Sequence, residues 1–388
     1  MTREVIYEDD EILVLHRPGA SAFTVVTFAA LTHRPQGDWI WAGPPIEKLD
    51  LDAVGFIGKR ENWYPAASMR AAAPAVRALL RPQAVGYGYS MGGYAVLKYG
   101  RLLGLTHGLA VSPQVSIDRA EVPWERRFQR FRDPALHAGM ITRPGEAPPI
   151  MLVAGDPGWE LDGLHLRTAM TQGARLVALP FMRHAAIDRF TSSQVLEHVL
   201  ALVLAGDAAG VQSYLRGRRA DSVQWHIWLG REAEARGHRF AAWFWEGAAR
   251  LGARPTQIAI IRGAAAQERL VALWVSGQRG KARRLADATI EAQGGQAAGL
   301  VRLGELLMRY NMPMRGIHCF RKALKAAPHM PAAHLGLLRA LQRTKAKVAF
   351  AHARTAALRM LAHRPDDRAA VLALEPLAEA LEAVSQER

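Results

Sequence analysis

The sequence predicts two parts: an α/β domain over residues 1–205, with a mostly parallel sheet and helices on both faces, and an all-α domain over residues 206–388. In the first part, apolar runs of strand length alternate with helix-length segments, which is typical of a parallel sheet covered by helices. After residue 205 the strand patterns stop, and segments rich in Ala, Leu, Arg and Trp are separated by glycines. The chain has 388 residues, 50% of them hydrophobic, which is enough for two packed cores.

The predicted strands of the first part lie near residue 5 and at 12–16, 24–28, 51–57, 85–87, 108–111, 149–155 and 175–181. Helices are predicted at 69–80, 93–103 and 164–173, between successive strands. Residues 117–147 show no clear strand pattern, so we expect a small inserted lid there that leaves the pocket rather open.

The segment Gly88-Tyr89-Ser90-Met91-Gly92 joins an apolar run to a helix-like run. A serine between two glycines on a tight strand-to-helix turn is a nucleophile elbow, because the glycines permit a strained backbone that exposes the hydroxyl. The free N–H groups at the start of the next helix would lie near that hydroxyl and suit a developing oxyanion. The alternative is that Ser90 only caps this helix.

On this motif the first 205 residues resemble the α/β-hydrolase superfamily. The resemblance implies a catalytic order of serine, acid and histidine, with the acid after a later strand and the histidine near the end of the domain. Asp156 follows the predicted strand 149–155, and His184 follows the predicted strand 175–181. We therefore predict a triad of Ser90, Asp156 and His184.

Other residues compete for two of these roles. Asp162 and Asp118 are alternatives for the acid, and Asp156 could merely open a turn before Pro157. His33 and His165 are alternatives for the histidine, although neither follows the last strand.

A serine hydroxyl needs an imidazole to take its proton, and the imidazole needs a carboxylate to fix its tautomer. The resemblance also implies an oxyanion hole made by the backbone N–H of Met91 and that of Ala29 or Ala30, which follow the strand 24–28. The glycine-rich form of that loop, common in lipases and esterases, is absent.

Three further side chains are predicted to bind substrate. Trp63 and Tyr64 follow the strand 51–57 and could form a flat platform for sugars or aromatic groups. Gln114, after the strand 108–111, could line the leaving-group side. The alternative for Trp63 and Tyr64 is a packed loop that holds both rings against the domain.

The elbow, the loop at 62–65 and the segment 112–118 are together similar to a bacterial hydrolase-like group associated with surface polysaccharides. This resemblance implies action on acyl groups of a glycan or a glycan precursor.

In the second part, Leu303, Gly304, Leu307, Gly316, Phe320, Ala323 and Pro328 fall at spacings that match the tetratricopeptide consensus. That consensus describes paired helices that repeat about every 34 residues. The resemblance covers roughly 160 residues with one good repeat, and it implies a concave surface that binds a protein partner. The alternative is a helical appendage packed against the first domain.

Composition restricts the remaining choices. No run of eighteen apolar residues and no basic, apolar leader is present, so we expect neither a membrane span nor a signal peptide, and the single Cys319 suits a reducing cytoplasm. No Cys/His cluster is present, so no metal is expected, and the triad chemistry requires no cofactor.

The net charge is +15 and the pI is near 10.5. Basic clusters lie at 126–132, 216–219 and 279–284, but they match no nucleic-acid module, so a solvated basic face is the preferred interpretation.

Three functions fit the sequence. The preferred one is a serine hydrolase that cleaves an ester through an acyl-enzyme, on a small-molecule or glycan substrate. The alternatives are a binding scaffold with a vestigial hydrolase fold, and an acyltransferase that uses the same acyl-enzyme with an acceptor other than water.

Overall fold

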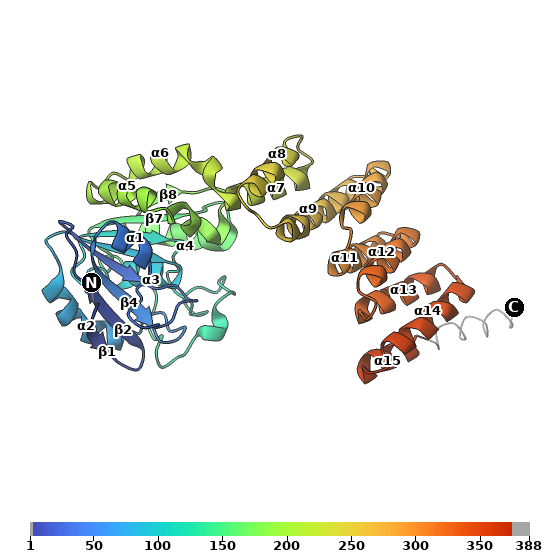
Figure 1. Cartoon of the computed structure of the whole chain (residues 1–388), viewed down its shortest axis with the longest axis horizontal. Helices are drawn as coiled ribbons and strands as arrows, with labels where there is room; N and C mark the ends of the chain where they lie inside the picture. Colours follow the sequence, from blue (N-terminus) through green and yellow to red (C-terminus); the bar gives the residue numbers. More distant parts are fainter. Residues whose placement is uncertain (1–2, 375–388) are drawn as a thin grey trace. The chain divides into compact units, whose positions relative to one another are not determined.

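A computed structural model describes residues 3–374 of the chain (Figure 1). Within these residues, eight strands form one sheet in the order β1-β2-β4-β3-β5-β6-β7-β8. The strands are β1 (Glu4–Glu8), β2 (Ile12–Arg17), β3 (Thr24–Phe28), β4 (Asp52–Gly58), β5 (Ala84–Tyr89), β6 (His107–Val111), β7 (Ile150–Gly155) and β8 (Arg175–Ala178). The predicted strands all lie at these positions.

Strand β2 runs antiparallel to both β1 and β4, whereas every neighbouring pair from β4 to β8 is parallel. The predicted mostly parallel sheet is therefore confirmed. The parallel strands end at one edge of the sheet, which is where open α/β sheets place their ligands. The loops after β5, β6, β7 and β8 meet at that edge.

Helices cover both faces of the sheet, as predicted. Val26, on one face of β3, belongs to the core packed by α2 (Ala66–Leu79), α3 (Met91–Tyr99) and α4 (Glu160–Thr171). Val25, on the other face, belongs to the core packed by α1 (Gly43–Lys48), α5 (Ser193–Leu204) and α6 (Ala208–Gly217). Because both faces are buried there, the central strands β3, β4, β6 and β7 are buried along nearly their whole length, whereas the edge strands β1 and β8 are partly exposed.

The segment between β6 and β7 is irregular. Its single regular element is the short 3-10 helix η1 (Gln129–Phe131), so the expected absence of a strand at 117–147 is confirmed.

The chain divides into two compact units, Met1–Trp228 and Leu229–Arg388. The sequence places the boundary at residue 205, but Val211 and Leu215 of α6 are buried in the sheet's core, so this helix belongs to the first unit.

The described part of the second unit is all helical. Its elements are the end of α7 (Val223–Arg236), α8 (Ala241–Arg250), α9 (Pro255–Val275), α10 (Arg279–Ala292), α11 (Ala297–Arg309), α12 (Pro313–Ala326), α13 (Pro331–Arg343), α14 (Lys347–Met360) and α15 (Pro365–Leu372). Helices α10, α12 and α14 begin 34 residues apart, and so do α11, α13 and α15. The spacing expected from the sequence is thus present in the structure. None of the helices described is long and apolar enough to span a membrane.

Glycines let these helices approach closely around Phe320. A Cβ on Gly304 of α11 would lie 2.8 Å from the Phe320 ring, and one on Gly336 of α13 would lie 2.3 Å from it. The fully buried ring of α12 therefore packs directly against the backbones of two neighbouring helices.

Candidate active site

Ser90 lies on a strained turn between β5 and α3. Its backbone adopts φ 54° and ψ −116°, which a residue with a Cβ rarely adopts. The flanking glycines make the turn possible: a Cβ on Gly88 would lie 2.3 Å from the carbonyl oxygen of Gly92, and one on Gly92 would lie 2.2 Å from that of Phe28. The expected elbow is present, and the hydroxyl does not cap α3.

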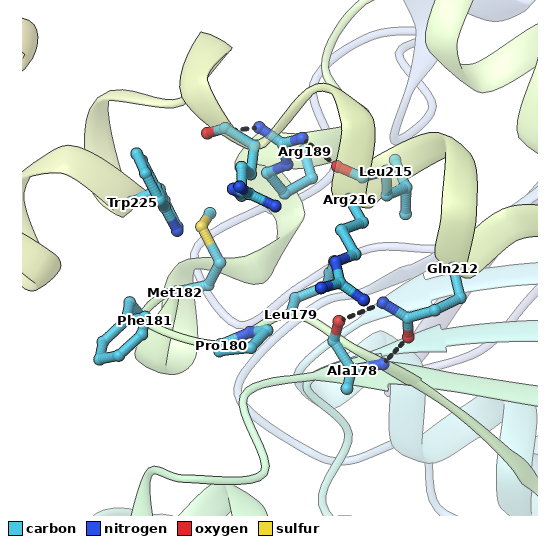
Figure 2. Close-up of a pocket in the computed structure, with 11 residues that line it drawn as sticks. Ala178, Leu179, Pro180, Phe181, Met182, Arg189, Gln212, Leu215, Arg216 and Trp225 are labelled. Carbon is cyan, nitrogen blue, oxygen red and sulfur yellow. Dashed lines mark hydrogen bonds between the residues drawn. The ribbon is translucent and has the colours of Figure 1, made fainter.

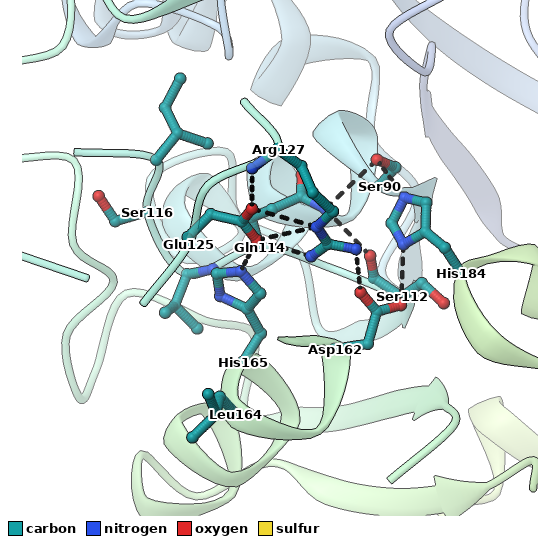
Figure 3. Close-up of polar contacts among 12 residues, drawn as sticks. Ser90, Ser112, Gln114, Ser116, Glu125, Arg127, Asp162, Leu164, His165 and His184 are labelled. Carbon is teal, nitrogen blue, oxygen red and sulfur yellow. Dashed lines mark hydrogen bonds and ion pairs between the residues drawn. The ribbon is translucent and has the colours of Figure 1, made fainter. Parts of the chain in front are cut away.

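His184 faces the serine from the loop after β8. Its Nε2 atom lies 3.0 Å from Ser90 Oγ (Figure 3). The Tyr89 hydroxyl fixes the backbone of this loop, because it donates to the His184 carbonyl oxygen at 2.9 Å. The structure thus brings together two members of the predicted triad.

The carboxylate beside His184 belongs to Asp162, not to Asp156. Asp162 Oδ2 accepts from His184 Nδ1 at 2.8 Å. The Asp156 carboxylate instead accepts from the backbone N–H of Gly158 at 3.0 Å and of Arg183 at 2.9 Å. Asp156 therefore ties the end of β7 to the loop that carries His184, and the prediction that its carboxylate meets the imidazole is wrong.

The position of Asp162 follows from the start of α4. The helix begins at Glu160, so its first turn lies just past the sheet edge and directs Asp162 back toward the histidine. A carboxylate in the first turn also interacts favourably with the helix dipole.

A buried network extends from Asp162 into the inserted segment (Figure 3). Arg127 Nη1 donates to Asp162 Oδ1 at 2.7 Å, and the same guanidinium holds both carboxylate oxygens of Glu125. Glu125 Oε2 lies 2.9 Å from His165 Nε2. Since His165 Nδ1 accepts from the Val115 N–H at 3.1 Å, its proton is on Nε2 and is donated to Glu125. Donors and acceptors therefore alternate along the whole network.

The environment sets the charges of these groups. Burial opposes the charge of Asp162, but the hydrogen bond from His184 and the Arg127 charge outweigh it and lower the pKa of Asp162. Burial likewise opposes the charge of Glu125, while His165 and Arg127 bring the pKa of Glu125 down to about 2. Burial lowers the pKa of His165, which stays neutral. Burial raises the pKa of Asp156.

Gln114 contacts Ser90 directly. Its Nε2 atom donates to Ser90 Oγ at 3.3 Å, and its Oε1 atom accepts from Trp63 Nε1 at 3.3 Å. Gln114 is fully buried and is positioned to orient the hydroxyl.

Trp63 and Tyr64 do not form an exposed platform. Trp63 is 1% exposed and packs against Phe128 and Phe131 of the inserted segment, with ring centroids 5.4 and 5.8 Å apart. The Tyr64 hydroxyl is buried and donates to the Ala29 carbonyl oxygen at 2.7 Å. Both residues have a left-handed backbone, and both rings lie in the core, so the packed-loop alternative describes them.

The predicted oxyanion donors differ in availability. Met91 is the first residue of α3, where a helix leaves its N–H groups without an intrahelical partner. The Ala29 N–H donates to the Phe56 carbonyl oxygen at 2.9 Å, so it is already used in the sheet. Ala30, the next residue, is buried at the same sheet edge.

The sequence indicated no role for Arg127 or Glu125. It offered His165 only as an alternative for the triad histidine, whereas His165 contacts Glu125 and the Val115 N–H instead. The only sequence signal was the basic cluster at 126–132, which we interpreted as a solvated face. Aromatic rings of Tyr89, Phe128 and Trp159 lie 5.4 to 6.1 Å from the His184 ring, and Ser90 is only 4% exposed, so the site is less open than expected.

The site consists of side chains and backbone groups. Among the residues described, no group of three or more His, Cys, Asp or Glu side chains is arranged to hold a metal ion.

No protein-family model and no curated protein sequence matches the chain. Among solved structures, it is similar to the capsule O-acetyltransferase of Neisseria meningitidis serogroup A in complex with caged gadolinium, with 11% identity and a TM-score of 0.39, over 51% of this chain and 92% of that one. A second structure of that acetyltransferase gives 12% identity and a TM-score of 0.37, over 50% of this chain and 93% of that one. A mutant of it in complex with CoA gives a TM-score of 0.33.

Proposed function

We propose that residues 1–228 form a serine enzyme that handles acyl groups, with Ser90 as nucleophile, His184 as general base and acid, and Asp162 as the carboxylate that orients the histidine. The observation that carries this proposal is the continuous set of contacts from Asp162 through His184 to a serine on a strained, glycine-flanked turn. Backbone strain of this kind is concentrated at active sites.

The reaction begins when Ser90 Oγ attacks the carbonyl carbon of an ester and its proton passes to His184 Nε2. The Met91 N–H, with that of Ala30, stabilises the negative oxygen of the tetrahedral intermediate. The C–O bond to the leaving group then breaks, and His184 returns the proton to the leaving alkoxide. Ser90 is left as an acyl-enzyme.

The second half repeats these steps with an acceptor hydroxyl. His184 takes the acceptor's proton as its oxygen attacks the acyl carbon, and then returns a proton to Ser90 Oγ as the acyl-enzyme bond breaks. Water as acceptor gives ester hydrolysis, and an alcohol gives acyl transfer. On the resemblance noted in the sequence, we favour an acylated glycan or glycan precursor as the substrate.

A fluorophosphonate probe tests the nucleophile. We expect peptide mass spectrometry to find the label on Ser90, and the labelling rate to fall by about 10³-fold or more in His184→Ala. The matched control is Ser112→Ala, because Ser112 is a buried serine with a left-handed backbone at the end of the neighbouring strand. Labelling in the control should be unchanged. Folded protein that is not labelled, or is labelled elsewhere, would contradict the proposal.

Product analysis separates the two reactions. The protein is incubated with an O-acetylated polysaccharide, with and without an unacetylated acceptor glycan, and free acetate is compared with transferred acetyl groups. Free acetate alone identifies an esterase, and acetylated acceptor identifies a transferase. Both products must be lost in Ser90→Ala.

We propose separately that the helical unit binds a protein partner. Large apolar side chains are exposed on several of its helices, including Trp243, Ile260, Val275, Met314 and Val348. Contiguous exposed apolar patches mark interaction surfaces, and we propose that these side chains contribute to such a patch. A photo-crosslinking residue at Met314 should trap a discrete partner, whereas one at the exposed Lys281 should not.

A further inference from the structure

The first unit contains a second cavity, away from the serine. Its volume is about 480 Å³, and it lies between the loop after β8, helix α6 and the start of α7 (Figure 2). It is lined by Ala178, Leu179, Pro180, Phe181, Met182, Arg189, Gln212, Leu215, Arg216, Arg219 and Trp225. We call it the β8–α6 cavity.

The charged side chains that line this cavity are all positive. Arg189, Arg216 and Arg219 contribute guanidinium groups, and no Asp or Glu is among the lining residues. The Gln212 amide is already engaged, because it exchanges two hydrogen bonds with the backbone of Ala178, at 2.6 and 2.9 Å. Polar recognition in the cavity therefore depends on arginine donors.

Arg189 is a buried cation without a carboxylate partner. It is 8% exposed, and its Nη atoms donate to the carbonyl oxygens of Leu215 at 2.7 Å and Arg219 at 3.3 Å. Among the ion pairs of the residues described, none includes Arg189. A buried charge is costly unless an opposite charge compensates it. Burial lowers the pKa of Arg189 and outweighs the longer-range attraction of the Asp221 carboxylate, so the site favours a further anion.

The rest of the lining is apolar and aromatic. Leu179, Pro180 and Met182 lie along one side, and the rings of Trp225 and Phe181 lie at one end (Figure 2). Phe181 is 36% exposed although it is a large apolar residue, and the Arg219 guanidinium lies 5.9 Å from the Trp225 ring. Flat side chains beside cations suit a planar group that carries negative charge.

We propose that the β8–α6 cavity binds a small organic phosphate, with its planar ring against Trp225 and Phe181 and its phosphate groups at the three arginines. A neutral ligand would leave the cations uncompensated, and inorganic phosphate would leave the apolar wall in water. Three guanidiniums match a diphosphate better than a single carboxylate, since each can donate two hydrogen bonds to phosphate oxygens.

Titration calorimetry of the full chain tests this proposal with three probes: ADP, which has both a ring and a diphosphate, adenosine, which lacks the phosphates, and pyrophosphate, which lacks the ring. We expect saturable ADP binding, and at least about tenfold weaker binding of adenosine and pyrophosphate. The double variant Arg216→Ala/Arg219→Ala should bind ADP at least about tenfold more weakly.

Two controls make the result specific. Arg101→Ala/Arg126→Ala removes the same charge from exposed positions outside the cavity and should bind ADP like the wild type. Ser90→Ala should also bind ADP normally, which separates this inference from the proposed catalytic function. The substituted arginines at 216 and 219 are exposed, so the variants should remain folded, as a thermal melt would confirm.

The proposal is overturned if ADP does not bind at about 5 mM, which corresponds to less than roughly 3 kcal/mol of binding free energy. It is also overturned if pyrophosphate binds as tightly as ADP, because that result shows only non-specific attraction of a polyanion. An equal loss of ADP affinity in the control double variant would have the same consequence.

Discussion

If the proposed mechanism is correct, replacement of Asp162 by asparagine should abolish activity by reversing the tautomer of His184. The carboxylate accepts two hydrogen bonds, from Arg127 Nη1 at 2.7 Å and from His184 Nδ1 at 2.8 Å. An asparagine has only one acceptor atom, and Arg127 can only donate, so the amide oxygen should turn to Arg127 and the NH2 group should face Nδ1. Nδ1 must then accept, and its proton moves to Nε2, 3.0 Å from Ser90 Oγ.

An imidazole with its proton on Nε2 cannot take the serine proton. Reversal of the tautomer by a carboxylate-to-amide change costs on the order of 10⁴-fold in rate, or about 5 kcal/mol of transition-state stabilisation. Asp156→Asn is the matched control, because it removes one of two hydrogen bonds from backbone N–H groups and leaves the contact between Asp162 and His184 in place. We expect it to lose roughly tenfold or less.

The assay is the pseudo-first-order rate of fluorophosphonate labelling near pH 8, with p-nitrophenyl acetate hydrolysis as a second readout. The double variant Asp162→Asn/Arg127→Met tests the tautomer argument further, because a purely structural role of Asp162 predicts no gain in rate from the second substitution. Without the Arg127 donors the amide is free to turn its oxygen to His184, so the double variant should react about tenfold faster than Asp162→Asn. The reasoning is refuted if Asp156→Asn is the more damaging single change, or if the double variant is slower than Asp162→Asn.

Three more predictions follow from single contacts. Gly92→Ala places a Cβ 2.2 Å from the Phe28 carbonyl oxygen and should reduce the rate of Ser90 labelling by more than about tenfold. Gly139→Ala, at a position with no atom within 4 Å of the added Cβ, should reduce the labelling rate far less at the same protein concentration. The interactions that lower the pKa of Glu125 stabilise the fold at pH values above the pKa of this group in the unfolded chain, and this stability is lost as pH falls toward about 2. The urea midpoint should therefore fall more between pH 5 and pH 3 in the wild type than in Glu125→Gln. Equal falls in the two proteins would contradict the network. Phe320→Ala should destabilise the helical unit by about 3–5 kcal/mol in chemical unfolding, while the rate of Ser90 labelling stays unchanged. A parallel loss of labelling would contradict the expectation that the first unit keeps its site when the helical unit is destabilised.

The fold was predictable because its signals are local. A strand buried on both faces is a continuous apolar run, and such runs precede Ser90, Asp156 and the loop of His184. The glycines at 88 and 92 are also a local signal, since each is required by a backbone atom that lies within 2.3 Å of the Cβ position. The order of these segments along the chain was sufficient to place the serine and the histidine at one edge.

The acid was not predictable in the same way. Asp156 has the better local signal, because it directly follows a strand, but its carboxylate is held by two backbone N–H groups that only the folded loops supply. Asp162 meets His184 because α4 starts at Glu160 and because Arg127, 35 residues away in the chain, holds its other oxygen. Neither condition is visible as a pattern of residue types.

The aromatic loop shows a related limit. The sequence places Trp63 and Tyr64 at the correct edge of the sheet. It does not reveal that both residues have a left-handed backbone and that both rings are buried in the core. Trp63 contributes to the site indirectly, through its hydrogen bond to Gln114.

The basic clusters were interpreted together as a solvated face, yet the structure gives them different surroundings. Arg127 of the first cluster is an internal residue that holds two carboxylates, while Arg216 and Arg219 of the second line the β8–α6 cavity. The count of 50 Lys and Arg residues therefore overstates the freely solvated positive charge, because some of these cations compensate buried acids such as Glu125.

The position of Arg127 also changes the meaning of the inserted segment. A lid that only covers a pocket can be shortened with a loss of substrate selectivity alone, because the nucleophile and base remain aligned. Here the segment supplies both Arg127 and Glu125, so it fixes the carboxylate that orients His184. Movement of this segment would therefore break the hydrogen bond from Arg127 to Asp162, so in the proposed mechanism access to Ser90 and the orientation of His184 depend on the same segment.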